Sequence, residues 1–291
     1  MVNSQNTLIS VIIPAYNAEK YIRESVASIQ HQTYQNIEII IIDDASMDET
    51  YRISKQLQKK DNRIRIFQHT TRKGPAQAVN TGWTEAIGTF IARMDADDIA
   101  FPNRLENQLD FLQHNPDHIA VGGTCIMTNE EGAPLYFKHF PETHKEIYRS
   151  CFIYNPLQEG TTMINRCKLP KDYMLFQTGV KTGEGVDLVF RLFRYGKVHN
   201  LNDYMIYYRL HHTNTSHKAR RMFFHTLKAR IRGVILYGYI PSIGGVIATL
   251  AQTILFVLLP EKAVTSLYKT LRYQSDLKST ISIRHQLPAH I

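Results

Sequence analysis

Cysteine is scarce in this chain of 291 residues. The three cysteines, Cys125, Cys151 and Cys167, are odd in number and form no CxxC pair, which argues against a disulfide framework and a cysteine zinc site. No apolar signal segment opens the sequence, and no low-complexity tract interrupts it. With 43% hydrophobic residues, we expect a globular protein in a cytoplasmic setting, with one large core or one core plus a small appendage.

A glycine-rich phosphate loop is also missing. After the first strand-like run the chain reads Pro14-Ala15-Tyr16-Asn17-Ala18, and no GxxxxGK[ST] sequence occurs anywhere. Without these glycines a pyrophosphate cannot approach the backbone at a helix N-terminus. The sequence therefore disfavours a dinucleotide-binding Rossmann domain, a P-loop enzyme and a nucleotidyltransferase.

Acidic residues are nearly absent from the C-terminal part. From residue 211 to the end there are 11 Lys and Arg against 2 Asp and Glu, whereas residues 1–210 carry 23 basic and 24 acidic groups. The whole net charge of +8 therefore comes from the tail. A basic excess confined in this way does not predict a nucleic-acid partner.

A long hydrophobic run is missing as well, although the tail comes close. Residues 243–259 form an uncharged run of 17, and a helix of that length reaches about 25 Å, short of the roughly 30 Å hydrocarbon core. Upstream, between Lys218 and Ser242, basic side chains alternate with aromatic and aliphatic ones. We expect a basic helical tail on the anionic cytoplasmic face of a membrane, bound peripherally or through a single-span or re-entrant segment. A solvated helical face beside a buried core helix is the alternative.

Strand and helix patterns alternate through the first 120 residues. Leu8–Ile13 and Ile37–Ile42 read as strands covered on both faces, and further strands are expected at Arg63–Phe67 and Thr89–Met94. The stretches between them show helical spacing, at residues 18–30, 47–60 and 75–87. Repeated βαβ units predict an α/β fold, a mostly parallel Rossmann-like sheet flanked by helices, with ligands beyond the carboxyl ends of the strands.

Acidic side chains stand at two of these strand ends. Asp43 and Asp44 follow the second strand, and Asp95, Asp97 and Asp98 follow the fourth. Three carboxylates within four positions repel one another unless they are solvated or neutralised by a hard cation such as Mn²⁺ or Mg²⁺. The cluster therefore indicates a metal site; a solvated acidic turn before the next helix is the alternative.

Four motifs in order resemble glycosyltransferase family two, a family of GT-A fold. The matching segments are SVIIPAYN (residues 10–17) with DDASMD (43–48), GPAQAVNTG (74–82), ARMDADDIAFPNRLE (92–106) and YYRLHHTNTS (207–216). The resemblance covers about residues 8–216. It implies an inverting, nucleotide-sugar-dependent transferase with a catalytic domain over residues 1–215 and a separate tail over 216–291.

The resemblance also implies roles for individual residues. Pro14, Ala15 and Tyr16 would line the nucleobase slot, and Asp44 would read the base. Asp95 and Asp97 match the DxD motif, with Asp97 and His211 at the metal, and Arg209 could stabilise the leaving group. Asp43 is more typical of a turn, and His212 of a solvated loop.

The chain departs from the family where the general base is expected. The segment TGEGVDLVFR (residues 182–191) resembles a family segment in which an aspartate follows the glutamate, but that position is Gly185 here. An inverting transferase needs a carboxylate to take the acceptor proton. Glu184 and Asp187 are the nearest candidates in sequence, with Asp187 equally suited to helix capping, and Glu159 is a third carboxylate.

We therefore expect a metal-assisted glycosyltransferase that moves a sugar from a UDP- or GDP-sugar to a glycan or lipid-linked acceptor of polysaccharide biosynthesis. The alternative is a non-catalytic, nucleotide-sugar-binding membrane protein that has lost the base.

Overall fold

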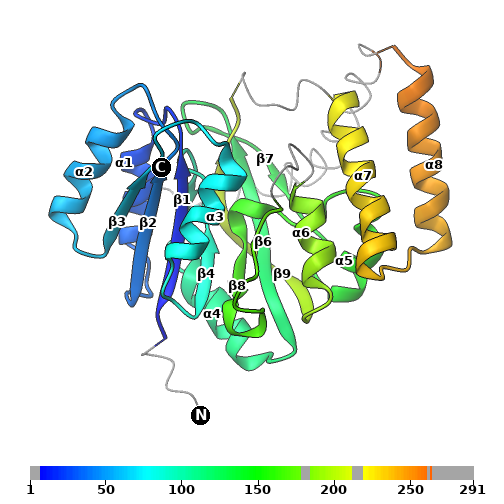
Figure 1. Ribbon diagram of the computed structural model, residues 1–291, viewed down its shortest axis with the longest axis horizontal. Coiled ribbons are helices and arrows are strands. Elements are labelled where there is room, and N and C mark those ends of the chain that lie inside the picture. The colour runs from blue at the N-terminus through cyan, green and yellow to red at the C-terminus, as the bar shows by residue number, and fades with distance from the viewer. Residues whose placement is uncertain (1–6, 178–183, 212–218, 261–262, 264–291) are drawn as a thin grey trace.

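The computed structural model describes residues 7–177, 184–211, 219–260 and 263. The described residues form one nine-stranded sheet in the order β3-β2-β1-β4-β8-β6-β9-β5, with β7 paired to β6. Helices cover both faces of this sheet (Figure 1). His212, Lys218, residues 182 and 183 of the base segment, and the tail beyond residue 263 lie outside the described residues.

The first half of the sheet is parallel, as the sequence predicts. Strands β3, β2, β1 and β4 are all parallel, and every residue of β1 and β2 is buried because helices cover both sides. The elements are β1 (Ile9–Ala15), α1 (Ile22–Gln30), β2 (Ile37–Asp43), α2 (Thr50–Lys60), β3 (Ile64–Gln68), α3 (Pro75–Glu85) and β4 (Phe90–Arg93).

Two helices begin later than their hydrophobic spacing suggests. Helix α2 begins at Thr50 because the Asp48 carboxylate accepts hydrogen bonds from the Thr50 N–H (3.0 Å) and hydroxyl (2.6 Å), which holds the preceding residues in a turn. Helix α1 begins at Ile22, and the loop before it is held by the Ala18 N–H, which donates to the Thr50 hydroxyl (2.7 Å). Through Thr50, hydrogen bonds connect the loop before α1 to the first turn of α2.

The second half of the sheet is mixed. β8 is antiparallel to β4 and β6, while the long strands β6 and β9 are parallel to each other. The elements are β5 (Ile99–Ala100), α4 (Arg104–His114), β6 (His118–Thr128), β7 (Pro134–Lys138), α5 (His144–Ser150), the 3₁₀ turns η2 (Glu159–Thr161) and η3 (Arg166–Lys168), β8 (Met163–Asn165), α6 (Glu184–Leu192) and β9 (Lys197–Arg209). The sheet is therefore parallel throughout its first half and at the long β6–β9 pair, and antiparallel at the pairs made by β5, β7 and β8.

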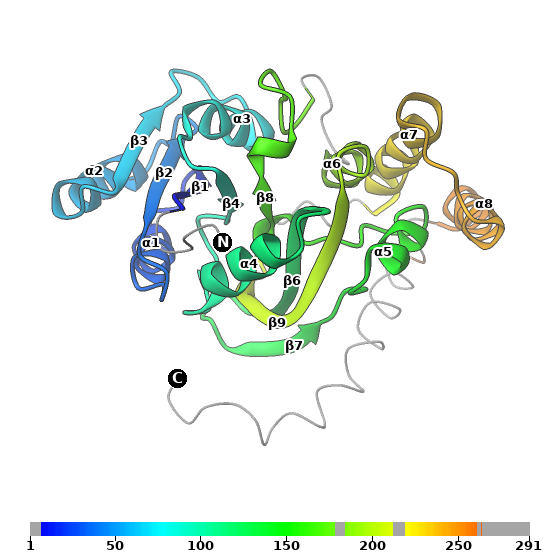
Figure 2. The same ribbon diagram turned by 90° about the horizontal axis from the view of Figure 1, so that it is seen from below.

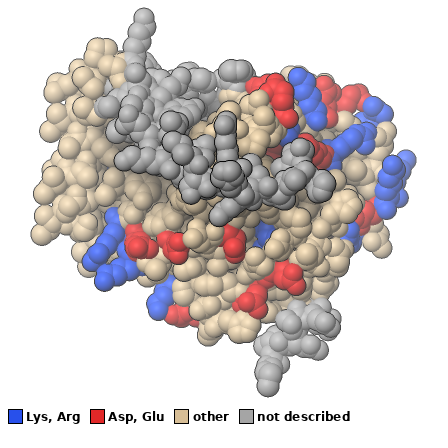
Figure 3. Space-filling view, turned by 180° about the vertical axis from the view of Figure 1, so that it is seen from behind, with Lys and Arg blue, Asp and Glu red and all other residues tan. Residues whose placement is uncertain are grey.

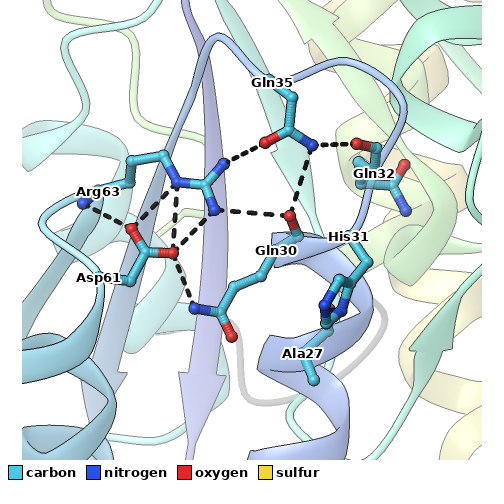
Figure 4. Close-up of polar contacts among 7 residues, drawn as sticks. All are labelled: Ala27, Gln30, His31, Gln32, Gln35, Asp61 and Arg63. Carbon is cyan, nitrogen blue, oxygen red and sulfur yellow. Dashed lines mark hydrogen bonds and ion pairs between the residues drawn. The ribbon is translucent and has the colours of Figure 1, made fainter.

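Each face of the sheet has its own core. Ile22, Val26 and Ile29 of α1 pack on one face together with α4, and Trp83 of α3 packs on the other with α6. A polar network reinforces the first face, where Arg63 joins Asp61 (2.8 Å) and Gln35 (2.8 Å) between α1, α2 and β3 (Figure 4). The two cores hold the strand ends of the parallel half in a rigid frame.

The last two helices stack outward from α6. Figures 1 and 2 place α7 (Ala219–Tyr237) between α6 and α8 (Ile243–Leu258). Ala229 of α7 belongs to the same core as α6. The division of the chain at residue 215 stays a prediction, but α7 packs onto the first part as one of its layers.

Helix α8 packs through small and polar residues and through Phe256, whose ring stacks on Phe223 of α7 with centroids 4.3 Å apart. Gly245 and Thr249 are its buried residues, the Thr249 hydroxyl donates to the Phe152 carbonyl (2.6 Å), and the Gln252 amide oxygen accepts from Arg230 (3.1 Å). Its aliphatic side chains face outward, and the edge of the molecule over α8 carries no charge, at the left of Figure 3. In the described part of the chain no helix is both long and apolar enough to cross a membrane.

Candidate active site at the carboxyl ends of the parallel strands

A cleft of about 540 Å³ opens where β1, β2 and β4 end. Parallel strands bring their carboxyl ends to one edge, so residues far apart in sequence meet there. Seven residues that the sequence points to line this cleft: Pro14, Ala15, Tyr16, Asp44, Asp95, Asp97 and His211. Arg93, Arg72 and Tyr21 line it as well and were not singled out from the sequence.

Asp44 is held by the loop that precedes α3. Its carboxylate accepts hydrogen bonds from His69 Nδ1 (2.7 Å) and from the N–H groups of Lys73 (2.8 Å) and Gly74 (2.7 Å). Burial alone would raise the pKa of Asp44, but these hydrogen bonds outweigh it and hold the pKa below its usual value. Three of about four acceptor positions are used. Asp44 therefore shapes the cleft wall and keeps one acceptor position for a ligand.

Tyr16 and Arg72 form the outer wall of the cleft at the end of β1. The Arg72 guanidinium lies 3.8 Å from the centre of the Tyr16 ring, a cation–π contact between the end of β1 and the loop before α3. The result is a flat, positively charged surface beside Asp44. Arg72 stands two residues before the segment GPAQAVNTG, and this position is the feature of the sequence that could have indicated it.

The acidic cluster lies at the other end and is incompletely neutralised. Asp98 is fully buried, and its Oδ1 accepts the backbone N–H of Arg209 (3.0 Å), whereas its Oδ2 has no hydrogen-bond partner among the described residues. Burial, and then the charges of Asp97 and Asp95, raise the pKa of Asp98 well above its usual value. Burial also raises the pKa of Asp95, against the opposing charge of Arg93. An additional positive charge would stabilise this cluster.

Asp97 and His211 meet directly in the cleft. Asp97 Oδ2 and His211 Nε2 are 2.9 Å apart, and this hydrogen bond raises the pKa of His211 despite partial burial. Within the described residues no three acidic, histidine or cysteine side chains form a cluster that could hold a metal ion by themselves. Mg²⁺ is normally bound through one or two carboxylates plus substrate phosphates, so Asp97 and His211 fit a cation shared with a diphosphate.

Arg209 does not lie where the sequence led us to expect it. Its guanidinium bonds Glu24 of α1 (2.9 Å), lies 4.3 Å from the Tyr21 ring centre, and is nearly buried between α1 and β9. It therefore positions these elements and does not line the cleft. Arg93, at the end of β4, is the arginine that lines the acidic end of the cleft, where it contacts Asp95 (2.9 Å) and Glu159 (2.5 Å).

The two proposed bases on α6 have different surroundings. Asp187 is buried and accepts a hydrogen bond from Arg232 of α7 (2.9 Å), with Tyr237 beside it, so its carboxylate faces α7. This contact argues against the expectation that Asp187 is the catalytic base. Glu184 lies at the start of α6, where burial and the nearby charge of Glu159 raise its pKa to about 7.

Comparisons with known proteins agree with this geometry. The family model described as "Glycosyl transferase family 2" matches residues 10–173. An uncharacterized glycosyltransferase of Haemophilus influenzae is 35% identical over 219 residues, covering 72% of this chain and 67% of the relative.

Two solved structures share the fold at lower identity. S. aureus TarS 1-349 in complex with UDP-GlcNAc has a TM-score of 0.63 at 20% identity, covering 79% of this chain and 67% of that one. The mannosyltransferase PcManGT from Pyrobaculum calidifontis, in complex with GDP-Man and Mn²⁺, has a TM-score of 0.58 at 18% identity, covering 90% and 79%. On the strength of the family model and the Haemophilus relative, supported by the GT-A fold, the chain belongs to glycosyltransferase family 2.

Proposed function

We propose that this protein transfers a sugar from a UDP- or GDP-sugar to a glycan or lipid-linked acceptor, with inversion and with the help of Mn²⁺ or Mg²⁺. One observation carries the proposal: a single cleft joins a flat, cationic slot at Tyr16 and Arg72 to an under-neutralised acidic cluster containing Asp97 and His211. The cleft volume of about 540 Å³ lies within the range of roughly 300–1,000 Å³ that is usual for ligand pockets.

The two ends of the cleft suit the two ends of a nucleotide sugar. The base would stack at Tyr16 and donate a hydrogen bond to the remaining acceptor position of Asp44. Asp97 and His211 would hold the cation, which neutralises charge on the departing diphosphate. Arg93 connects this end to Glu159 and keeps the Asp95 carboxylate in place. The ligands named for the TarS and PcManGT structures support this class of donor.

The outer face of α8 supports an acceptor at a membrane surface. Ile243, Ile247, Leu250, Ile254 and Leu258 are each more than half exposed on one helix that has no charged residue. A helix that packs through threonine, glutamine and one phenylalanine and leaves its isoleucine and leucine side chains exposed suits lipid better than water. We propose that α8 lies on an anionic lipid surface and brings the cleft to a lipid-linked or cell-surface glycan.

The basic residues of α7 contribute less to this surface than the sequence suggested. Arg230 is buried and bonds Gln252, and Arg232 is turned toward Asp187. Arg221 and Lys228 are the exposed basic residues among those described in α7. The proposed attachment of α8 to a membrane surface therefore depends more on apolar contact, and less on electrostatic attraction, than the net charge of the tail suggested.

A donor screen tests the enzymatic proposal. UDP, GDP, UDP-GlcNAc and GDP-mannose would be added with Mn²⁺ or with EDTA, and the thermal midpoint measured. We expect at least one of these ligands to raise the midpoint only with metal, because a ligand that binds the folded state stabilises it. The same donor should release its nucleoside diphosphate during turnover. If a ligand binds in a metal-dependent way but no nucleoside diphosphate is released with any acceptor, the non-catalytic alternative is favoured. If none of the ligands raises the thermal midpoint, the proposed class of donor is contradicted.

A further inference from the structure

The space beside Gly185 is filled by another residue's carboxylate. A Cβ added at Gly185 would lie 1.8 Å from Glu159 Oε1, 2.6 Å from its carboxyl carbon and 3.0 Å from Asn155 Nδ2. The backbone of Gly185 has no positive φ angle, so conformation does not require glycine here; a side chain at this position would displace the end of the Glu159 side chain. The Glu159 carboxylate, which comes from the turn η2, thus occupies the volume that a side chain at position 185 would take.

That volume lies next to the acidic cluster. Arg93 donates to Glu159 Oε2 (2.5 Å) and to Asp95 Oδ1 (2.9 Å), so one guanidinium joins both carboxylates. The neighbouring Gly160 also lies against the acidic cluster. A Cβ added there would lie 3.4 Å from Asp98 Oδ2 and 3.5 Å from Asp95 Oδ2. Glu159 keeps 28% of its side chain exposed, which leaves a path for a proton to solvent.

We propose that Glu159 is the general base of this enzyme, supplied from η2 into the space left by Gly185. The inference rests on the proposed function. In the step, the acceptor hydroxyl oxygen forms a bond to the anomeric carbon while the bond from that carbon to the diphosphate oxygen breaks. The bonding electrons leave with the nucleoside diphosphate, and the hydroxyl proton passes to the Glu159 carboxylate and then to water.

The neighbouring carboxylates are less suited to this step. Asp187 faces α7 and is engaged with Arg232. Glu184 is half-buried near Glu159, and no described residue donates a hydrogen bond that would hold its carboxylate in one orientation. The Arg93 hydrogen bond also gives Glu159 a defined orientation, which a general base requires.

The test compares an isosteric substitution with a relocation of the carboxylate. Glu159→Gln keeps the size of the side chain and an oxygen that accepts from Arg93. The double variant Glu159→Gly/Gly185→Asp removes the carboxylate from η2 and places one on α6 in the same volume. Glu184→Gln tests the competing carboxylate, and Glu142→Gln, at an exposed glutamate outside the cleft, is the matched control. Each would be assayed with UDP-GlcNAc and GDP-mannose, using water and p-nitrophenyl glycosides as acceptors.

We expect Glu159→Gln to lower kcat by about 10²–10⁴-fold, the usual contribution of a general base. Its affinity for UDP with Mn²⁺ and its thermal midpoint should stay close to those of the unmodified enzyme. The double variant should recover at least a tenth of the lost rate. Glu142→Gln should keep the full rate, and Glu184→Gln should lose far less of it than Glu159→Gln. A merely structural role for Glu159, as the ion-pair partner of Arg93, would show as a lower thermal midpoint in Glu159→Gln, and the double variant, which removes that partner altogether, would then recover no activity.

Unchanged kcat in Glu159→Gln would overturn the proposal while leaving the transferase function intact. A large loss in Glu184→Gln with little loss in Glu159→Gln would overturn it in favour of Glu184. If the unmodified enzyme releases no nucleoside diphosphate from any donor, the proposed function fails and this inference fails with it.

Discussion

At the scale of single residues, Asp97 and His211 carry the expected metal dependence. Asp97 is partly exposed and contacts His211, so its loss removes a ligand without opening the core. Mutating a residue that only supports a metal ligand typically lowers metal affinity by about 10–100-fold. Asp97→Ala, which removes a proposed ligand itself, should therefore weaken Mn²⁺-dependent UDP binding by about 100-fold or more. Isothermal calorimetry with and without Mn²⁺ measures this. Asp110→Ala, an exposed aspartate on α4, is the control, and undiminished Mn²⁺-dependent binding in Asp97→Ala would contradict the metal site.

Asp61 shows how one carboxylate links local structure to pH. Hydrogen bonds from Arg63, and to a smaller extent from Gln30, hold the pKa of Asp61 well below its usual value (Figure 4). A carboxyl whose pKa is depressed by folding adds stability above its unfolded pKa of about 3.9, and this stability is lost as pH falls through the folded pKa.

We therefore expect Asp61→Asn to lower the free energy of unfolding by about 1 kcal/mol at pH 7, the usual value of such an interaction near the surface. The difference in the free energy of unfolding between the variant and the unmodified protein should stay constant from pH 8 to 5 and become smaller below about pH 4. Urea unfolding as a function of pH checks this, with Asp110→Asn as control. A gap that widens in acid would show that Asp61 is not held in its ionised form by folding.

At the scale of elements, α6 is fastened to α7 by Asp187. Its carboxylate is buried, and Arg232 supplies the opposing charge. We expect Asp187→Asn to lower the free energy of unfolding by about 1–3 kcal/mol, because a hydrogen bond between charged groups is replaced by a weaker one. Turnover per folded molecule should be unchanged.

Two measurements separate the structural and catalytic roles of Asp187. Urea unfolding reports the stability of the α6–α7 contact, and nucleoside diphosphate release reports the chemistry. A loss of kcat by orders of magnitude at unchanged stability would restore Asp187 as a catalytic residue.

At the scale of the whole molecule, α8 gives one edge an apolar character. Ile247 and Ile254 are 62% and 59% exposed on its outer face. Burying a side chain of this kind contributes about 1.5–3 kcal/mol, so the pair Ile247→Ser/Ile254→Ser should weaken binding to anionic vesicles by at least about tenfold.

Vesicle sedimentation provides the measurement, and Leu135→Ser, an exposed apolar residue on β7, is the matched control. Salt should weaken binding modestly, because Arg221 and Lys228 each contribute about 1 kcal/mol near an anionic surface. Equal sedimentation of the pair variant and the unmodified protein would refute the membrane role of α8. A strong loss in Leu135→Ser would show that the contact is not specific to α8.

The sequence determined the parallel half of the sheet and the residues of the cleft. Runs such as Ile37–Ile42 are apolar on both faces, and the carboxylates that follow them must emerge at the strand ends. These features are local: strand propensity, helical spacing and a polar residue at a boundary act over a few positions. Asp44, Asp95 and Asp97 could therefore be placed in one cleft before any contact was known.

Only the tertiary structure decided which of the side chains near the site point into the site. Arg209 and Asp187 carry suitable chemistry in sequence, but both turn to neighbouring helices. Glu159 is 26 positions from Gly185 in the sequence, yet its carboxylate fills the space beside that glycine. Helix α8 likewise buries Gly245 and Thr249 and leaves most of its isoleucine and leucine side chains exposed, which its hydrophobic content alone does not predict. Which groups share a volume depends on the packing of segments distant in sequence, and no local pattern specifies it.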